Sequence, residues 1–196
     1  MDEGSASRTI EVQADNNAAL YYYPQPVIPF AQSAFDSKMT IHLEDETSKL
    51  FLLEIISCGR NAHEERFQYR RFSSKVLLYR GEKLIYRDNT RYEPGKMPME
   101  GIGLYEGFTH MANLFLSKLC DRGDADGLDR TSELKEKIWQ ILDEDSEVDG
   151  GVTRLTTGDL ALRIFGHRAQ KLQQIAEKIK EIYTSCQINH KSVMNE

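Results

Sequence analysis

The chain has 196 residues, of which 40% are hydrophobic and 29% are charged, so its composition is that of a folded globular domain and excludes a disordered chain. Its 25 basic and 31 acidic residues give a formal net charge of −6, which disfavours a protein that binds nucleic acid through the phosphate backbone. Three widely spaced cysteines support neither a disulfide framework nor a structural zinc site. No signal peptide or membrane-spanning apolar run is present, so we expect a reduced, cytoplasmic protein without membrane contact.

The first two thirds of the chain are dominated by strand patterns. Residues 1–17 are polar and are expected to be frayed, and residues 18–23 are aromatic and strand-like. Residues 39–43 alternate as a half-buried strand does, whereas the nearly continuous apolar stretch 49–58 predicts a strand buried on both faces. Further strands are expected at 66–72, 75–79 and 83–87, a loop at 89–101, and one long or two short strands at 104–119.

Two helices are predicted in the last third of the chain. Thr131 can cap a helix with an apolar stripe that contains Leu134 and Ile138, and a second stripe at helical spacing extends over residues 169–183. A hairpin, 152–156 and 159–165, lies between them. The order of elements predicts one β-rich α+β domain over residues 18–184, followed by a flexible tail at 185–196.

Glu54 is the most unusual residue in the predicted strands. Period-two geometry places it on the same strand face as Leu50, Leu52 and Ile56. A buried carboxylate must pair, take up a proton or face water. Two interpretations follow: Glu54 is a structural carboxylate paired with Arg60 or Arg163, or it lines a functional cavity or channel.

Other residues offer weaker functional signals. A hydrolase could use Glu54 with Glu64 or Glu65 as a carboxylate pair, although the sequence does not fix the separation of these groups. Residues 66–72 (RFQYRRF) interleave basic and aromatic side chains. This pattern is typical of a strand that binds nucleic acid and equally of a strand with one solvated face.

Four stretches, in order along residues 18–183, resemble the UreD (UreH) family of urease accessory proteins. They are residues 20–31 (LYYYPQPVIPFA), the apolar strand with Glu54 that continues into residues 59–67, residues 107–112 (GFTHMA), and residues 151–166 with the helix that follows. Tyr21 departs from the family pattern, which usually has Glu at this position. The positions that carry the motif are Pro24, Pro29, Phe30, Gly59, Arg60, Phe67, Thr153, Arg163 and Gly166.

The resemblance implies an elongated, mostly antiparallel β structure, sandwich-like or β-helix-like, with C-terminal α-helices. It also implies a maturation factor without enzymatic activity, which docks on the urease apoprotein together with UreF-type and UreG-type partners and supports nickel insertion. No stably bound cofactor is expected. Glu54, and less strongly His63 and Glu65, would line a transient nickel path in an internal channel.

The resemblance also implies a longer protein, because family members carry a sizeable β region before the segment that matches residues 20–31. We therefore expect an N-terminally truncated domain that is poorly soluble alone. Two alternatives from other classes stay open. One is a β-rich carbohydrate-active hydrolase that uses Glu54 and Glu65, and the other is an interaction domain in which the last helix supplies the contact surface.

Overall fold

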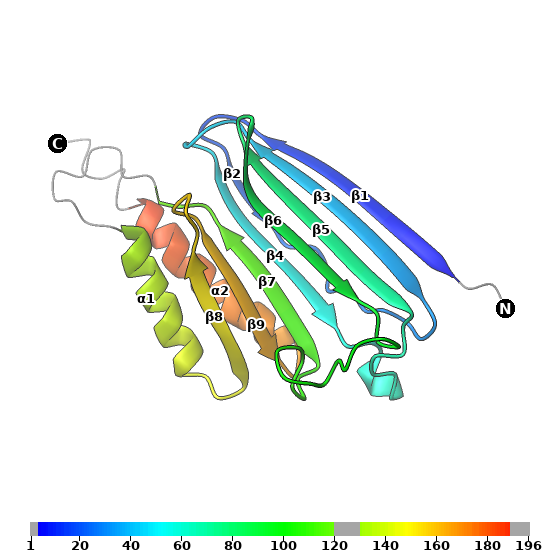
Figure 1. The fold of residues 1–196 in the computed structure, drawn as a ribbon. Coiled ribbons are helices and arrows are strands. Elements are labelled where there is room, and N and C mark those ends of the chain that lie inside the picture. The colour runs from blue at the N-terminus through cyan, green and yellow to red at the C-terminus, as the bar shows by residue number, and fades with distance from the viewer. Residues whose placement is uncertain (1–3, 120–129, 189–196) are drawn as a thin grey trace, which may run out of the picture.

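The computed structural model describes residues 4–119 and 130–188, which form two β-sheets and a layer of helices (Figure 1). Within these ranges, sheet A has the strand order β1-β3-β5-β6 and sheet B the order β2-β4-β7-β9-β8. The elements are β1 (Ser5–Ala14), β2 (Ala19–Tyr22), β3 (Ala34–Leu43), β4 (Lys49–Ser57), the 3₁₀ helix η1 (Asn61–His63), β5 (Arg71–Arg80), β6 (Lys83–Tyr92), β7 (His110–Leu116), α1 (Arg130–Asp143), β8 (Val148–Arg154), β9 (Leu160–Gly166) and α2 (Ala169–Ile188).

The first five strands alternate between the two sheets, as in a flattened β-helix. Parallel pairing joins β1 to β3 and β3 to β5 in sheet A, and β2 to β4 in sheet B. The remaining pairs are antiparallel, so both sheets are mixed. The predicted β-rich α+β class is confirmed, whereas antiparallel pairing is less dominant than expected because the chain coils before it forms hairpins.

The expectation of a frayed segment at 1–17 is wrong for residues 5–14. These residues form β1, whose ten residues pair in parallel with β3. Ile10, Val12 and Ala14 alternate with polar residues and pack into the core between the sheets. Since β1 is an edge strand with a solvated outer face, its sequence is too polar to stand out as a strand.

Other boundaries also differ from the prediction. Residues 104–109, expected to be strand, form turns and irregular backbone before β7. Residues 66–70 are bends rather than a strand, because Phe67 has a φ of 51° and turns its ring toward Tyr105. Strand β6 continues to Tyr92, into the segment expected to be a loop. Helix α2 continues to Ile188, past the predicted start of a tail at 185, and residues 189–196 of that tail lie outside the described ranges.

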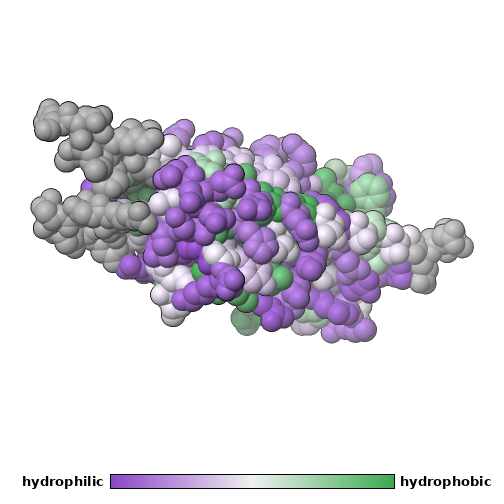
Figure 2. Space-filling view, turned by 90° about the horizontal axis from the view of Figure 1, so that it is seen from above, coloured by the Kyte–Doolittle hydropathy of each residue, from purple (hydrophilic) through white to green (hydrophobic). Residues whose placement is uncertain are grey.

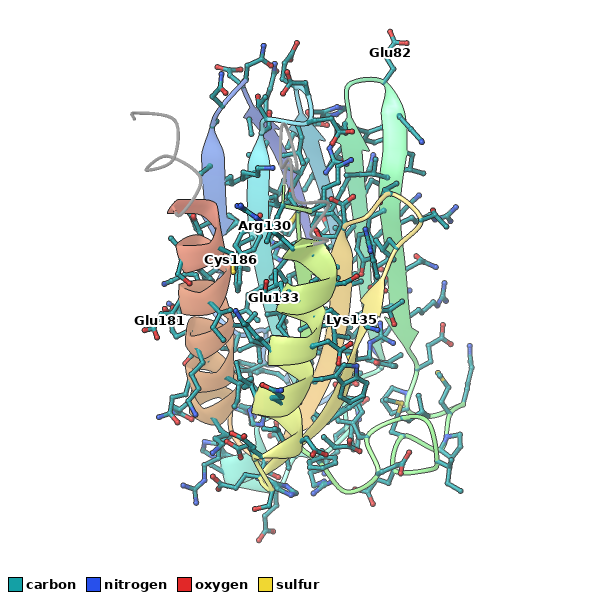
Figure 3. The ribbon with its side chains drawn as sticks, turned by 90° about the vertical axis from the view of Figure 1, so that its left-hand side faces the viewer. Glu82, Arg130, Glu133, Lys135, Glu181 and Cys186 are labelled. Carbon is teal, nitrogen blue, oxygen red and sulfur yellow. The ribbon has the colours of Figure 1, made fainter. Side chains whose placement is uncertain are left out.

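Sheet B lies between sheet A and the helices, so its inner strand β4 is buried on both faces, as predicted. Phe51, Leu53 and Ile55 pack with α1 and α2, whereas Leu50 and Leu52 pack against sheet A. Figure 3 looks onto the two helices, which lie side by side over sheet B. The expected apolar stripes form this contact, with Ile138 on α1 and Ile179 on α2 fully buried.

The face shown in Figure 2 is mostly hydrophilic, with small and separate apolar patches. The exposed large apolar side chains of the described residues are Ile28, Phe30, Leu84, Ile102 and Trp139. Poor solubility of the isolated chain stays a prediction. In the ranges that the structure covers, no helix combines the length and apolar character needed to cross a bilayer.

Candidate functional site

Two rows of polar side chains face each other between the sheets. In sheet A, strand pairing aligns Arg8, Ser37, Ser74 and Thr90 across four strands. In sheet B it aligns Glu54, Asn113 and Arg163 across β4, β7 and β9. We call these seven residues, together with Asp88 of β6, the polar layer. It separates an apolar cluster around Leu50 and Leu52 from a second cluster around Phe72 and Met111.

Glu54 is the carboxylate at the centre of the polar layer. Its side chain is 15% exposed, and its Oε1 accepts a long bond of 3.4 Å from Nη2 of Arg8. The same guanidinium donates to the Ser37 hydroxyl at 3.1 Å. Burial raises the pKa of Glu54, and the negative charge of Asp88 adds to this effect, whereas Arg8 and a hydrogen bond with Ser74 oppose it. The negative charge of the buried Glu54 carboxylate is therefore only weakly compensated by nearby donors and cations.

The expected partners of Glu54, Arg60 and Arg163, are both wrong. Arg60 pairs with Glu65, and Arg163 donates to Oδ1 of Asn113 at 2.9 Å and to Oδ1 of Asp88 at 3.2 Å. Arg8 takes the place of the expected partners because β1 pairs in parallel with β3 and brings Arg8 within reach of Glu54. The side chains of Arg8 and Arg163 are 29% and 47% exposed, so the polar layer reaches solvent at two opposite edges of the sandwich.

Small cavities adjoin the centre of the polar layer. One has a volume of about 20 Å³ and the other about 10 Å³, and Glu54 and Asn113 border both. The larger has room for one water molecule. The Ser74 hydroxyl, which belongs to the layer, is buried and borders the larger cavity beside Glu54. The layer thus gathers carboxylate, amide and hydroxyl oxygens around two small cavities, and these are donor types that divalent cations accept.

Glu65 lies elsewhere, in a tightly packed loop at one end of the sandwich. Its Oε2 accepts from Nε of Arg60 at 2.7 Å and from the backbone N–H of Ala31 at 3.2 Å, and Arg60 lowers the pKa of Glu65. The Arg60 guanidinium also covers the Phe30 ring at 4.4 Å. Gly59 has a φ of 132°, and a Cβ on it would lie 2.0 Å from the Glu65 carbonyl oxygen. These contacts hold Glu65 in place as a structural part of the loop.

His63 ends the 3₁₀ helix η1 and is exposed. It lines a cleft of about 440 Å³ together with His110 and His167. Nowhere in residues 4–119 and 130–188 do three or more His, Cys, Asp or Glu side chains gather closely enough to hold a metal ion. The structure therefore does not bring Glu54, His63 and Glu65 into one site, and their role in a nickel path stays a prediction.

The other motif positions are mainly parts of the framework. Phe67 packs edge-on against Tyr105 at 4.9 Å between ring centroids, and Gly166 lets Leu172 of α2 approach sheet B closely. Pro24 follows the end of β2, and Thr153 is exposed on β8. Among the motif residues, Arg163 belongs to the polar layer.

The arrangement gives no support to a hydrolase with a carboxylate pair. Such an enzyme needs two carboxylates on either side of one substrate bond. Glu54 borders the cavities between the sheets, whereas Glu65 is held in the end loop by Arg60, and Glu64 is exposed beside it.

Sequence reasoning identified Glu54 and Arg163 but missed the rest of the polar layer. Register was the missing information, because only strand pairing shows that these polar residues lie at one level. A signal was present in the strands themselves. Ser74 occupies an inward position between Phe72 and Val76, and Asn113 occupies one between Met111 and Phe115.

Comparisons with known proteins identify the family of this chain. Residues 1–195 match the family described as UreD urease accessory protein. Urease accessory protein UreH of Helicobacter pylori strain J99 is 31% identical over 183 residues, which cover 93% of this chain and 64% of that protein. Urease accessory protein UreD of Acetivibrio thermocellus is 32% identical over 184 residues, with 93% and 66% covered. The chain thus spans slightly less than two thirds of the length of these two relatives, and it belongs to the UreD family of urease accessory proteins.

Proposed function

We propose that this chain acts in the maturation of urease as a protein without catalytic activity of its own. In this proposal it docks on the urease apoprotein together with UreF-type and UreG-type partners and supports nickel insertion. Family membership and the names of the relatives support the urease role. Cys58 and Cys186 are free thiols in the described part of the chain, which is consistent with action in the reducing cytoplasm.

The polar layer is the observation that carries the nickel role. Nickel is the cargo here, and a passage for cargo must hold the ion weakly enough to release it. Glu54, Asn113 and Ser74 offer oxygen atoms without forming a closed ligand cage. A cation that moves along the layer would exchange successive oxygen atoms and waters.

The two arginines of the layer oppose the entry of a cation. In the resting chain Arg8 contacts Glu54, and Arg163 contacts Asp88, so each carboxylate already faces a positive charge. A divalent cation would repel both guanidinium groups. We infer that docking on a partner moves these exposed arginines aside and opens the layer at its edges.

Co-purification with the urease apoprotein and a UreF-type partner tests the proposal. The nickel content of the urease is measured after incubation with nickel and the UreG-type partner, in the presence and absence of this chain. We expect the chain to retain both proteins and to raise the nickel content. Failure to retain either protein, or equal nickel content without the chain, would contradict the proposed function.

A further inference from the structure

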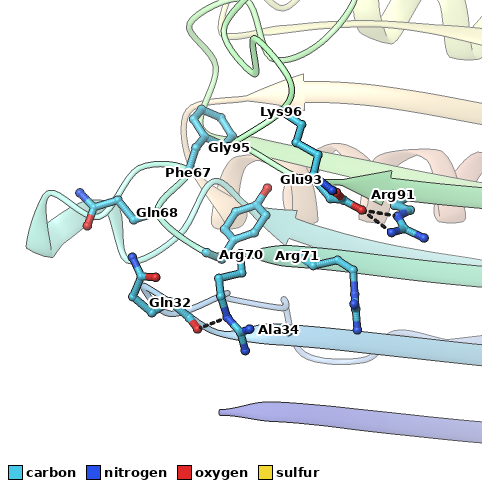
Figure 4. Close-up of a pocket in the computed structure, with 11 residues that line it drawn as sticks. Gln32, Ala34, Phe67, Gln68, Arg70, Arg71, Arg91, Glu93, Gly95 and Lys96 are labelled. Carbon is cyan, nitrogen blue, oxygen red and sulfur yellow. Dashed lines mark hydrogen bonds and ion pairs between the residues drawn. The ribbon is translucent and has the colours of Figure 1, made fainter. Parts of the chain in front are cut away.

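A basic cleft lies at the end of sheet A, away from the polar layer (Figure 4). Its volume is about 700 Å³, and it lies between the starts of β3 and β5, the end of β6 and the loops beside them. The described residues that line it include four cationic side chains and one carboxylate: Arg70, Arg71, Arg91, Lys96 and Glu93. This local excess of positive charge stands out in a chain with a net charge of −6.

Carboxylates and carbonyl oxygens of the chain already bind the cations of this cleft. Glu93 accepts from Nε of Arg91 at 2.7 Å and lies 2.5 Å from Nζ of Lys96. Lys96 and Arg91 together lower the pKa of Glu93 to about 2. Arg71 pairs with Asp36, and Arg70 donates to the Gln32 carbonyl oxygen at 2.9 Å. The cations of the cleft thus have carboxylate partners within the chain itself, Asp36 and Glu93.

Arg91 and Lys96 have donor capacity beyond these contacts. Their side chains are 59% and 78% exposed, and in the described structure they share the single carboxylate of Glu93. An arginine has five N–H donors and a lysine three, so both can bind a further oxygen acceptor without leaving Glu93. The flat guanidinium fork fits a carboxylate with two parallel hydrogen bonds.

The side chains that line the cleft favour a peptide over a nucleic acid strand. Gln32 and Gln68 line it with amide groups that can bond a peptide backbone. Single-stranded nucleic acid needs open aromatic faces for base stacking. Phe67 is packed edge-on against Tyr69 and Tyr105, and Tyr69 is only 2% exposed, so these rings are already engaged.

We propose that this cleft is a docking site for an acidic segment of a partner protein, with Arg91 and Lys96 as its exposed carboxylate-binding groups. The interleaved basic and aromatic residues at 66–72 therefore receive a role in protein recognition. The inference rests on the proposed function in assuming a protein partner. Its test needs no urease, so failure of the docking site is separable from failure of the maturation role.

The test is binding of a fluorescent octaglutamate peptide to the full chain, measured by fluorescence anisotropy at low and at physiological salt. A Gly-Ser peptide of equal length is the neutral control. We expect octaglutamate to bind, with an affinity that falls as salt screens the charges. The double variant Arg91→Gln with Lys96→Gln should bind roughly tenfold more weakly.

Two further variants make the result specific to the cleft. Arg154→Gln with Lys178→Gln removes the same charge from exposed positions on β8 and α2, and it should leave binding within twofold of the unmodified chain. Glu93→Gln should strengthen binding, because it removes the internal competitor for Arg91 and Lys96. Circular dichroism checks that each variant is folded.

Three results with octaglutamate would overturn the proposal. They are no binding of octaglutamate, equal weakening in both double variants, and weaker binding after Glu93→Gln. Tighter binding of single-stranded DNA than of octaglutamate would overturn it as well, since the cleft would then recognise phosphates.

Discussion

Two carboxylates between the sheets, Glu54 and Asp159, have opposite environments. Asp159 is fully buried and accepts from both terminal nitrogens of Arg80, at 2.7 and 3.2 Å. It also accepts from the backbone N–H of Lys118 and the Thr157 hydroxyl. Glu54 has one arginine contact of 3.4 Å. Asp159, which joins β5 to the start of β9, therefore has a full set of hydrogen-bond donors. Glu54, at the centre of the polar layer, has few.

The difference separates a structural role from a candidate functional one. A buried charge with several well-directed donors fixes the two sheets relative to one another. A buried carboxylate with weak compensation costs stability, and it is retained where its oxygen atoms serve another purpose. The contrast supports a framework role for Asp159 and is consistent with the proposed role of Glu54 in a nickel passage.

The largest predicted effect is that of Asp159→Ala. This change leaves the Arg80 guanidinium buried without its main partner, so we expect the free energy of unfolding to fall by about 3–5 kcal/mol. Urea unfolding followed by circular dichroism measures it. Asp149→Ala, at an exposed position on β8, is the matched control and should change stability by no more than about 0.5 kcal/mol. Equal effects of the two changes would show that Asp159 does not stabilise the framework.

The parts of the framework with strong hydrophobic periodicity could be predicted from the sequence. The buried strand β4, the inward position of Glu54 and both helices followed from spacing alone. The polar layer did not, because its rows depend on the register of seven strands, and β1 is too polar for its pairing to be predicted. Asp159 escaped notice because it belongs to a short turn, and its partner Arg80 is distant in sequence.

A substitution in the loop around Glu65 should have an effect of intermediate size on stability. We expect Gly59→Ala to lower the free energy of unfolding by about 1–3 kcal/mol, because a side chain at this φ is strained and its Cβ meets the Glu65 carbonyl. Thermal unfolding measures the loss. Gly95→Ala is the control, since a Cβ there has nothing within 4 Å. A Gly59→Ala chain as stable as the control would show that this loop is not constrained as described.

The smallest effect on stability is predicted for Glu54→Gln. Because the pKa of Glu54 is raised in the folded chain, its ionisation destabilises the fold as pH rises through that pKa. At and below the unfolded value of about 4.3 this penalty is absent. Glu54→Gln removes it, so the variant should match or exceed the unmodified chain at pH 7, by no more than about 1 kcal/mol. Urea unfolding between pH 4 and pH 8 tests this. The prediction would be contradicted if the stability of the variant relative to the unmodified chain fell between pH 4 and pH 7.

The most direct test of the account is the amount of nickel that urease receives from chains carrying Glu54→Gln or Glu82→Gln. Both changes remove one carboxylate charge, but Glu82 lies exposed at the tip of the β5–β6 hairpin (Figure 3). We predict that both variants fold and retain urease, that Glu82→Gln loads nickel normally, and that Glu54→Gln loads much less. Equal nickel content with the two variants would contradict the assignment of Glu54 to a nickel passage.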